Sequence, residues 1–256
     1  MTIWQRIKAR LGLYERRFIH DPLREVPELR EIITDELQQR NGSDARNCQA
    51  VADALVFAVQ YAIGASVEGD IAEFGCMTGR TATVLSGAMA SFRTDKLLHL
   101  FDSFEGLPQT TNEVDAASFH TREGTWRPGT CKGISPQELR KRCEAFIKPE
   151  QVRIYEGWFS KTISKFPAGT RLSLLHVDCD LYESAKDVLD HVFAKHMVAE
   201  GAIVLFDDWN CNRGSKNLGE RKVWAEMVAK YQIDCSDHGS YGWASHKFIV
   251  HDYAKL

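Results

Sequence analysis

The sequence has no apolar run long enough to cross a bilayer, and its start, MTIWQRIKARLG, lacks the apolar centre and cleavage site of a secretory signal. The seven cysteines are an odd number, scattered and without a CxxC pair, which is typical of free thiols in a reducing compartment. Lys and Arg total 32 against 35 Asp and Glu, so the charge balance gives no reason to expect nucleic-acid binding. These absences predict a cytoplasmic protein without a membrane span.

The region 70–256 has the pattern of one α/β domain. Short apolar runs alternate there with helical patterns, which predicts a mostly parallel sheet flanked by helices. The expected strands are Asp70–Gly75, Leu97–Asp102, Val152–Gly157, Leu172–Asp178 and Ala202–Asp208, with further strands, possibly antiparallel, in Trp243–Asp252. The expected helices are Thr81–Ser91, Ser135–Ile147, Tyr182–His196 and Glu220–Tyr231.

Residues 1–69 form a different region, predicted to be a helical extension. Trp4, Ile7 and Leu11 share one helical face, and Asn47–Ile63 reads as a second, strongly apolar helix. Such helices can pack against the sheet, cover the site as a lid or join two subunits in a homodimer. A basic amphipathic anchor on a membrane surface is the alternative.

Acidic residues follow two of the expected strands. Asp178 and Asp180 end the fourth, in LLHVDCDLYES, and Asp207 and Asp208 end the fifth. The carboxyl ends of parallel strands meet at one edge of the sheet, where such folds bind ligands. Four carboxylates crowded there repel one another. Either some are protonated or a hard cation such as Mg²⁺, Mn²⁺ or Ca²⁺ lies among them.

The first strand leads into a glycine-containing turn, DIAEFGCMTGRTA, with Gly75 and Gly79 before a helix. Glycine allows backbone to approach a ligand closely. The spacing is not GxGxxG and no P-loop lysine follows, which favours a nucleoside cofactor without a pyrophosphate, such as S-adenosylmethionine. Asp102, at the end of the second strand, can accept hydrogen bonds from a ribose diol, or it can be a helix cap or turn residue.

Five segments in this order, EFGCMTGRTA, LFDSFEGLP, EGWFSKT, LLHVDCDLYESAKDVLD and IVLFDDWN, resemble the macrocin O-methyltransferase family (TylF, MycF, NovP). The resemblance covers about residues 70–210. It implies a class I methyltransferase fold, a Rossmann-like α/β arrangement with a mostly parallel seven-stranded sheet. It also implies S-adenosylmethionine as methyl donor, Mg²⁺ as cofactor and a sugar hydroxyl as acceptor.

The resemblance also assigns roles to residues. The family's metal aspartates match Asp178, Asp207 and Asp208, and its general base matches Asp180. The expected cofactor contacts are Glu73, Asp102 and Ser103 from the matching motifs, the turn residues Gly75, Thr78 and Gly79, and Trp158 after the third strand.

Two segments lie where an acceptor would be selected and are not matched by the resemblance. They are the loop Gln109–Gly133, which contains His120, and WNCNRGSKNLGERKVW after the second acidic pair. The basic residues of the latter can face an anionic acceptor or simply solvent. The acceptor is expected to be a small molecule or a glycan.

Two other functions fit part of the pattern. A metal-dependent glycosyltransferase could use the D-x-D pair, but the glycine turn and the Asp102 segment then lack a shared explanation. A non-catalytic cofactor-binding or assembly protein could use the apolar N-terminal helices as its interaction surface. Intact metal and base positions argue against this second alternative.

Overall fold

The computed structural model describes residues 43–254, so the predicted helical face of Trp4, Ile7 and Leu11 lies outside the described residues. The strands are β1 (Asp70–Phe74), β2 (Leu98–Asp102), β3 (Val152–Glu156), β4 (Leu172–Val177), β5 (Val198–Phe206), β6 (Asp234–Tyr241) and β7 (Ser245–Asp252). The α-helices are α4 (Ser43–Gly64), α5 (Arg80–Ser91), α6 (Glu113–Ala117), α7 (Phe119–Arg122), α8 (Pro136–Glu144), α9 (Phe159–Thr162), α10 (Tyr182–Ala194) and α11 (Gly219–Tyr231).

The strands form one sheet in the order β3-β2-β1-β4-β5-β7-β6. The five strands β1 to β5 are parallel, and β7 runs antiparallel to both β5 and β6. The chain leaves β1 toward β2 on one side and continues through β4 on the other. This places the point where strand order reverses between β1 and β4, with the predicted site residues at its carboxyl end.

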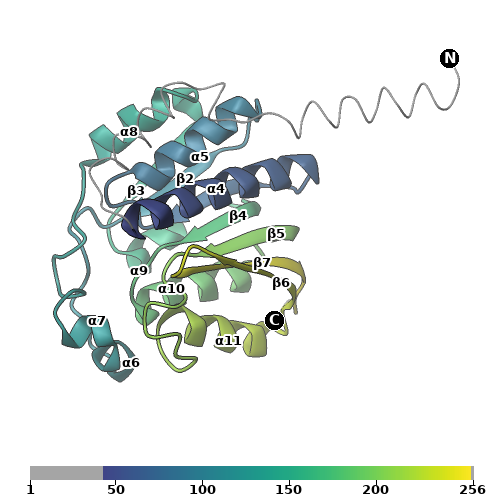
Figure 1. Ribbon diagram of the computed structural model, residues 1–256. Helices are drawn as coiled ribbons and strands as arrows, with labels where there is room; N and C mark the ends of the chain where they lie inside the picture. Colours follow the sequence, from purple (N-terminus) through teal and green to yellow (C-terminus); the bar gives the residue numbers. More distant parts are fainter. Residues whose placement is uncertain (1–42, 255–256) are drawn as a thin grey trace, which may run out of the picture.

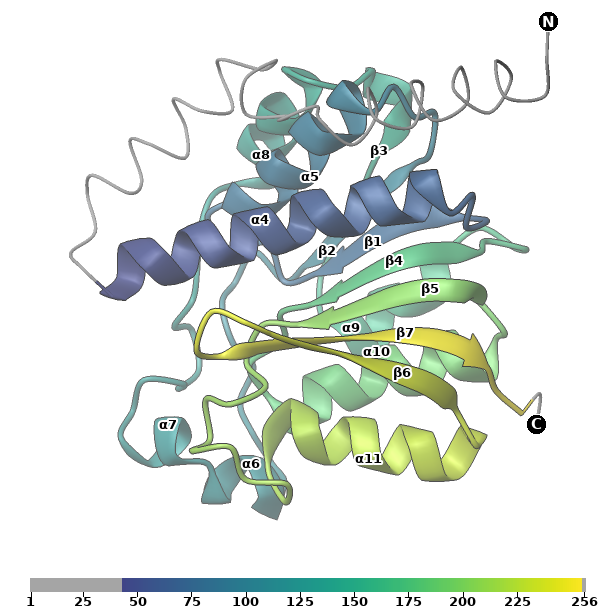
Figure 2. The same cartoon turned by 45° about the vertical axis from the view of Figure 1, so that its right-hand side comes forward.

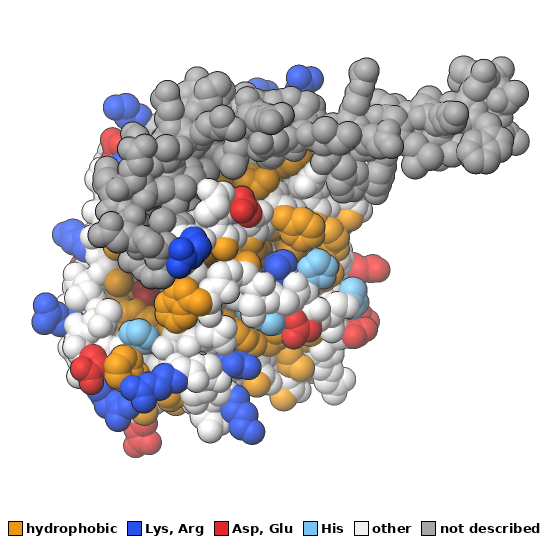
Figure 3. Space-filling model, in the orientation of Figure 1, with side chains coloured by type: hydrophobic (Ala, Val, Ile, Leu, Met, Phe, Trp, Pro, Cys, Tyr) orange, Lys and Arg blue, Asp and Glu red, His pale blue; other side chains and the backbone are white. Residues whose placement is uncertain are grey.

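Helices cover both faces of the sheet (Figures 1 and 2). On one face, α4, α5 and α8 bury an apolar layer that includes Leu55, Leu85 and Leu139. On the other, α10 and α11 pack Val188 and Trp224 against the sheet. On the surface, basic and acidic side chains lie interspersed over the face seen in Figure 3.

Helix α4 confirms that the second apolar helix expected from the sequence packs against the sheet. Its Leu55, Ala58 and Val59 are completely buried, in the same layer as residues of β1 and α5. No helix among residues 43–254 combines the length and apolar character needed to cross a membrane.

Two strands differ from the expectation. Strand β5 begins at Val198, four residues early, and its register against β4 shifts between Leu172 and Leu174. The exposed Glu200 and the adjoining Gly201 interrupt the apolar run, which hides the start of the strand in the sequence. Strand β6 has the mostly polar sequence DCSDHGSY. It is a strand because its backbone pairs with β7 at the sheet edge.

Candidate functional site

A cavity of about 720 Å³ lies at the carboxyl ends of the parallel strands. Nine of the eleven predicted site residues line it; the exceptions are Glu73 and Gly79. The sequence-predicted residues that line it are Gly75, Thr78, Asp102, Ser103, Trp158, Asp178, Asp180, Asp207 and Asp208. The fold therefore brings the glycine turn and both acidic pairs to one hollow.

Gly75 allows the turn after β1 to touch the turn after β4. Its φ is +98°, and a Cβ at this position would lie 1.9 Å from the carbonyl oxygen of Asp178. Any side chain there would collide with backbone as well as strain the residue. Gly79 acts differently: it precedes α5 with a φ of +74°, and a Cβ would meet Ile134 and Leu139.

The carboxylate of Asp102 organises the floor of the cavity. Its Oδ2 accepts the backbone N–H of Cys76 at 2.7 Å and of Met77 at 3.0 Å, and its Oδ1 accepts the N–H of Phe104 at 2.6 Å. Asp102 thus ties β2 to the glycine turn of β1. A carboxylate has about four acceptor positions, so a position remains for a ligand hydroxyl, and the turn and ribose interpretations are compatible.

Ser103 and Trp158 lie beside this floor. The Ser103 hydroxyl donates to the Gly106 carbonyl at 2.7 Å and accepts the N–H of Glu105 at 3.0 Å, which shapes the turn after β2. Trp158 immediately precedes α9 and lines the cavity near Phe159. Its half-buried indole is available to pack against a bound planar group.

The D-x-D segment forms a sharp turn after β4. The N–H of Asp178 donates to the carbonyl of Phe74 at 2.9 Å, and the N–H of Leu181 donates to the carbonyl of Cys179 at 2.5 Å. Asp180 has a φ of +58°, which is uncommon for a residue with a side chain and costs energy unless the surroundings hold it. Asp178, Cys179 and Asp180 all line the cavity, and Cys179 also packs into the apolar core.

The second acidic pair follows β5 and is held from two directions. The Ser245 hydroxyl donates to the Asp207 carboxylate at 3.2 Å, and the Asp208 N–H donates to Oε2 of Glu220 at 3.0 Å. Glu220 comes from the first turn of α11 and is 1% exposed. The sequence interpretation did not select Glu220; its position next to Asp208 depends on how α11 packs.

These carboxylates are electrostatically crowded. Burial raises the pKa of Asp178 and of Asp180 well above the usual range, and the charges of Asp207 and Asp208 raise it further. Burial, followed by the charge of Asp207, raises the pKa of Asp208 to about 7. Burial and the charge of Asp208 raise the pKa of Glu220 as well. The cluster is therefore disfavoured in its fully ionised form.

The donors available here suit a hard cation. All are carboxylate oxygens, and within residues 43–254 the buried Oδ2 of Asp208 and Oε1 of Glu220 have no hydrogen-bond partner. In the same residues, no group of three or more His, Cys, Asp or Glu side chains is already arranged as a metal site. The chemistry of Asp178, Asp207 and Asp208, which line the cavity together, fits Mg²⁺.

Glu73 lies outside the cavity. It is completely buried and pairs with His176, its register partner on β4, through Oε1 and Nδ1 at 2.9 Å. Side chains alternate along a strand, so Glu73 points to the same face as Ile71, in the layer below α4 and α5. Its predicted cofactor contact is not tested by this arrangement and stays a prediction.

The sequence model of the macrocin O-methyltransferase (TylF) family matches residues 48–230, well over half of the chain. The chain belongs to this family. The TylF-family match covers the glycine turn, both acidic pairs and the two segments that the motif resemblance left unmatched.

Two curated proteins are similar in sequence. One is the demethyldecarbamoylnovobiocin O-methyltransferase of Streptomyces niveus, 31% identical over 153 residues, which cover 59% of this chain and 56% of that protein. The other is an 8-demethyl-8-(2,3-dimethoxy-α-L-rhamnosyl)-tetracenomycin-C 4′-O-methyltransferase of Streptomyces olivaceus, 28% identical over 163 residues, which cover 61% and 59%. The matches thus span a little over half the length of these relatives.

Solved structures of methyltransferases share the fold. The O-methyltransferase NovP superimposes with a TM-score of 0.74 at 20% identity, covering 91% of this chain and all of NovP. The calicheamicin methyltransferase CalS11 gives a TM-score of 0.65 at 19% identity, covering 88% and 92%. The TylF-family chain therefore has the class I methyltransferase fold that its sequence motifs predicted.

Three of the four basic residues in the segment after the second acidic pair are engaged away from the cavity. The Arg213 guanidinium lies 4.5 Å from the centre of the Phe119 ring. Arg221 donates to the Gly214 carbonyl at 2.8 Å, and Lys222 pairs with Glu226 at 2.8 Å. None of these three basic residues lines the cavity, which favours the interpretation without an anionic acceptor.

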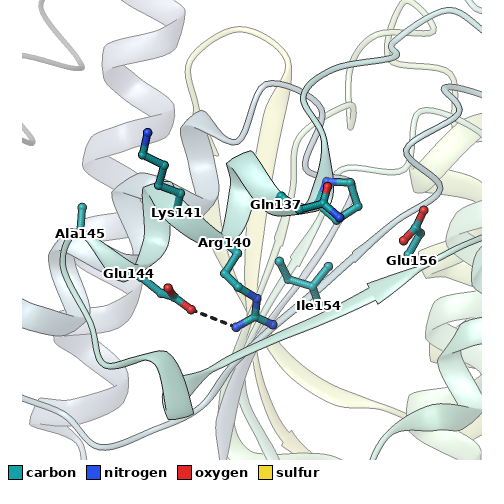
Figure 4. Close-up of a pocket in the computed structure, with 8 residues that line it drawn as sticks. Gln137, Arg140, Lys141, Glu144, Ala145, Ile154 and Glu156 are labelled. Atoms are coloured by element: carbon teal, nitrogen blue, oxygen red, sulfur yellow. Dashed lines mark hydrogen bonds and ion pairs between the residues drawn. The ribbon is translucent and has the colours of Figure 1, made fainter.

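A second hollow, of about 570 Å³, lies between α8 and β3 (Figure 4). Within it Arg140 and Glu144 of α8 form an ion pair at 3.1 Å, and Ile154 and Glu156 come from β3. It contains none of the predicted site residues.

Proposed function

We propose that this protein is an S-adenosylmethionine-dependent, Mg²⁺-dependent O-methyltransferase whose acceptor is a hydroxyl of a sugar or glycosylated compound. The observation that carries the proposal is that one cavity is lined by the glycine turn, by Asp102 and by the carboxylates that end β4 and β5. Family membership and relatives named as O-methyltransferases of glycosylated compounds support it. A glycosyltransferase would leave the glycine turn unused.

The cofactor side of the cavity is the surface formed by Gly75, Thr78, Asp102, Ser103 and Trp158. When bound there, S-adenosylmethionine supplies an electrophilic methyl group. Gly75 lets the turn after β1 pack against the backbone of Asp178. Asp102 would offer its remaining acceptor position to a ribose hydroxyl, and Trp158 would pack against the adenine. Together these residues orient the donor, and positioning of this kind supplies roughly 7–11 kcal/mol in well-aligned reactions.

The metal side of the cavity is Asp178, Asp207 and Asp208. A divalent cation held there would lower the pKa of an acceptor hydroxyl and offset the repulsion among these carboxylates. Ser245 holds Asp207 in place, and Glu220 fixes the backbone of Asp208.

Asp180 is our candidate for the general base. Its carboxylate lines the cavity and its pKa is raised by burial and by the neighbouring Asp208. A cation held by Asp178, Asp207 and Asp208 would favour the ionised form of Asp180, which is the form that can take a proton. The proton of the acceptor hydroxyl would pass to Asp180 as the oxygen bonds to the methyl carbon and the sulfur–methyl bond of the donor breaks, which leaves S-adenosylhomocysteine.

The test combines binding with turnover. Calorimetry should show binding of S-adenosylhomocysteine, and methyl transfer to a panel of deoxysugar glycosides should require Mg²⁺ and stop in excess EDTA. Full activity in EDTA would remove the metal from the scheme. Cofactor binding without transfer to any glycoside would favour the non-catalytic alternative. The possible homodimer and the cytoplasmic location stay predictions.

A further inference from the structure

The helices α6 and α7 belong to the segment between β2 and β3, yet they lie beside α10 and the loop that follows β5 (Figures 1 and 2). Asp178 and Asp180 lie in the turn just before α10, and Asp207 and Asp208 begin the loop after β5. The segment makes a buried polar contact with α10 and another with that loop.

The first attachment is Asp115 in α6, which is 2% exposed. Its Oδ1 accepts the N–H of Tyr182 at 2.7 Å, and its Oδ2 accepts the N–H of Glu183 at 3.1 Å. These N–H groups start α10, whose own N-cap residue, Leu181, makes no capping hydrogen bond with its side chain. Asp115 therefore caps α10 from a distant segment, two residues beyond Asp180.

A neighbouring amide reinforces this attachment. Asn112 donates through Nδ2 to Oδ2 of Asp115 at 2.7 Å and to Oε2 of Glu183 at 3.0 Å. Its Oδ1 accepts the N–H of Asp115 at 2.8 Å. The Asp115 side chain is thereby held in the orientation that caps α10.

The second attachment reaches the loop after β5. The Ser118 hydroxyl donates to Oδ1 of Asn212 at 2.7 Å in a buried contact, and Nε2 of His120 lies 2.8 Å from the Cys211 carbonyl oxygen. The Cys211 thiol in turn donates to Oδ1 of Asp208 at 3.0 Å. The same short segment thus contacts the loops that carry both acidic pairs.

We propose that residues 112–120 form a clamp that fixes the turn carrying Asp178 and Asp180 relative to the turn carrying Asp207 and Asp208, with Asp115 as its positioning residue. Asp180 has a left-handed backbone, and such a conformation persists only where the surroundings hold it. Capping of the adjacent helix by Asp115 supplies that restraint. The clamp as a structural feature does not depend on the proposed function. Only its effect on methyl transfer rests on that function.

The decisive test is hydrogen exchange on the full-length chain, compared between Asp115→Ala and Glu113→Ala. Glu113 is an exposed acid in the same helix and gives a control of matched charge. Asp115→Ala should speed exchange of the amides in 180–187 by about tenfold or more, because it removes the cap. Exchange in β1 and α5 should not change, and Glu113→Ala should behave as wild type.

S-adenosylhomocysteine affinity, measured by calorimetry, separates positioning from general damage. It should stay within about threefold of wild type in Asp115→Ala, which is under 1 kcal/mol. Two results for Asp115→Ala would overturn the clamp. One is unchanged amide exchange in 180–187, and the other is a uniform rise in exchange across the chain together with loss of S-adenosylhomocysteine affinity relative to wild type. Failure of the wild type to bind S-adenosylhomocysteine would instead count against the proposed function and leave the exchange comparison to decide the clamp.

A variant at the other attachment keeps the proposal testable if Asp115→Ala does not fold. Ser118→Ala leaves the Asp115 cap intact and removes the hydrogen bond to Asn212. It should speed exchange in 208–213 and leave 180–187 close to wild type. The clamp would be contradicted if amide exchange in both 208–213 and 180–187 were the same in Ser118→Ala as in wild type.

Discussion

Asp180 combines a backbone that disfavours ordinary side chains with a carboxylate in an acidic cavity. Its φ is +58°, and burial together with Asp208 raises its pKa. Strained residues with perturbed pKa values gather at functional sites. These features, added to its position in the cavity, support the assignment of Asp180 as the base.

Asp180→Asn should therefore lower kcat by roughly 10²–10⁴-fold, the usual contribution of general acid–base catalysis. The amide keeps the size of the side chain but cannot take the proton. S-adenosylhomocysteine binding should stay close to wild type. Asp95→Asn, at a side chain that is 95% exposed, is the control. A loss of less than about tenfold would show that Asp180 is not the base.

The position of Gly75 requires glycine, both for its backbone conformation and for its close contact with Asp178. Gly75→Ala combines a positive φ with a Cβ 1.9 Å from the Asp178 carbonyl oxygen. Gly124→Ala has a similar φ of +77° but meets no atom within 4 Å, so it isolates the cost of backbone strain, roughly 1–3 kcal/mol. Urea unfolding should show a clearly larger loss of stability at Gly75. Equal losses of stability in the two variants would mean that the fold does not depend on close contact between the turn after β1 and the turn after β4.

At the scale of elements, the segment after β5 bears on which acceptors fit. Its Arg213, Arg221 and Lys222 are held by an aromatic ring, backbone carbonyls and Glu226. Among the described residues that line the cavity, Arg80 is the only basic one, against seven acids. The excess of acidic side chains therefore disfavours binding of an anionic acceptor in this cavity.

We accordingly expect kcat/KM to be at least about tenfold higher for a neutral sugar acceptor than for its uronic-acid counterpart. A tenfold ratio corresponds to about 1.4 kcal/mol. Like charges brought together at a binding site cost free energy. The measurement is methyl transfer to a matched glucoside and glucuronide, with Arg213→Ala as control, because it should leave the ratio unchanged. A glucuronide that reacts as fast as the glucoside would contradict this expectation.

At the scale of the whole molecule, the acidic cluster links stability to pH. The folded protein raises the pKa of Asp208 from 3.8 to about 7, so it binds protons more readily than the unfolded chain. The stabilising contribution of the protonated group is complete below the unfolded pKa and is lost as the pH rises through the folded pKa. Asp178, Asp180 and Glu220 act in the same direction.

In EDTA, the free energy of unfolding should therefore fall as the pH rises from about 4 to about 7, by about 1.4 kcal/mol per unit of pKa difference. Mg²⁺ should reduce the fall, because a cation stabilises the ionised carboxylates. Urea unfolding at several pH values measures the slope, and Asp208→Asn should flatten it. Stability in EDTA that is constant or rises over this range would contradict the prediction.

The prediction of fold was most successful where the pattern is local. Apolar runs bounded by glycine or acids located the parallel strands. The helix expected from Ser135 corresponds to α8, where the Ser135 hydroxyl accepts the N–H of Glu138. Strand β6 escaped because its polar sequence becomes a strand only through pairing with β7. Propensity in strands depends on such partners.

The sequence by itself determined the alternation of strands and helices and the acids at the strand ends, since both follow from short-range pattern and the rule that parallel strands end on one side. The tertiary structure alone decided that Asp115 caps α10 and that Glu220 supports Asp208. It also turned Glu73 into the core beside His176. These contacts join residues as many as 103 positions apart, and no local pattern specifies which distant groups the packing of the layers will bring together.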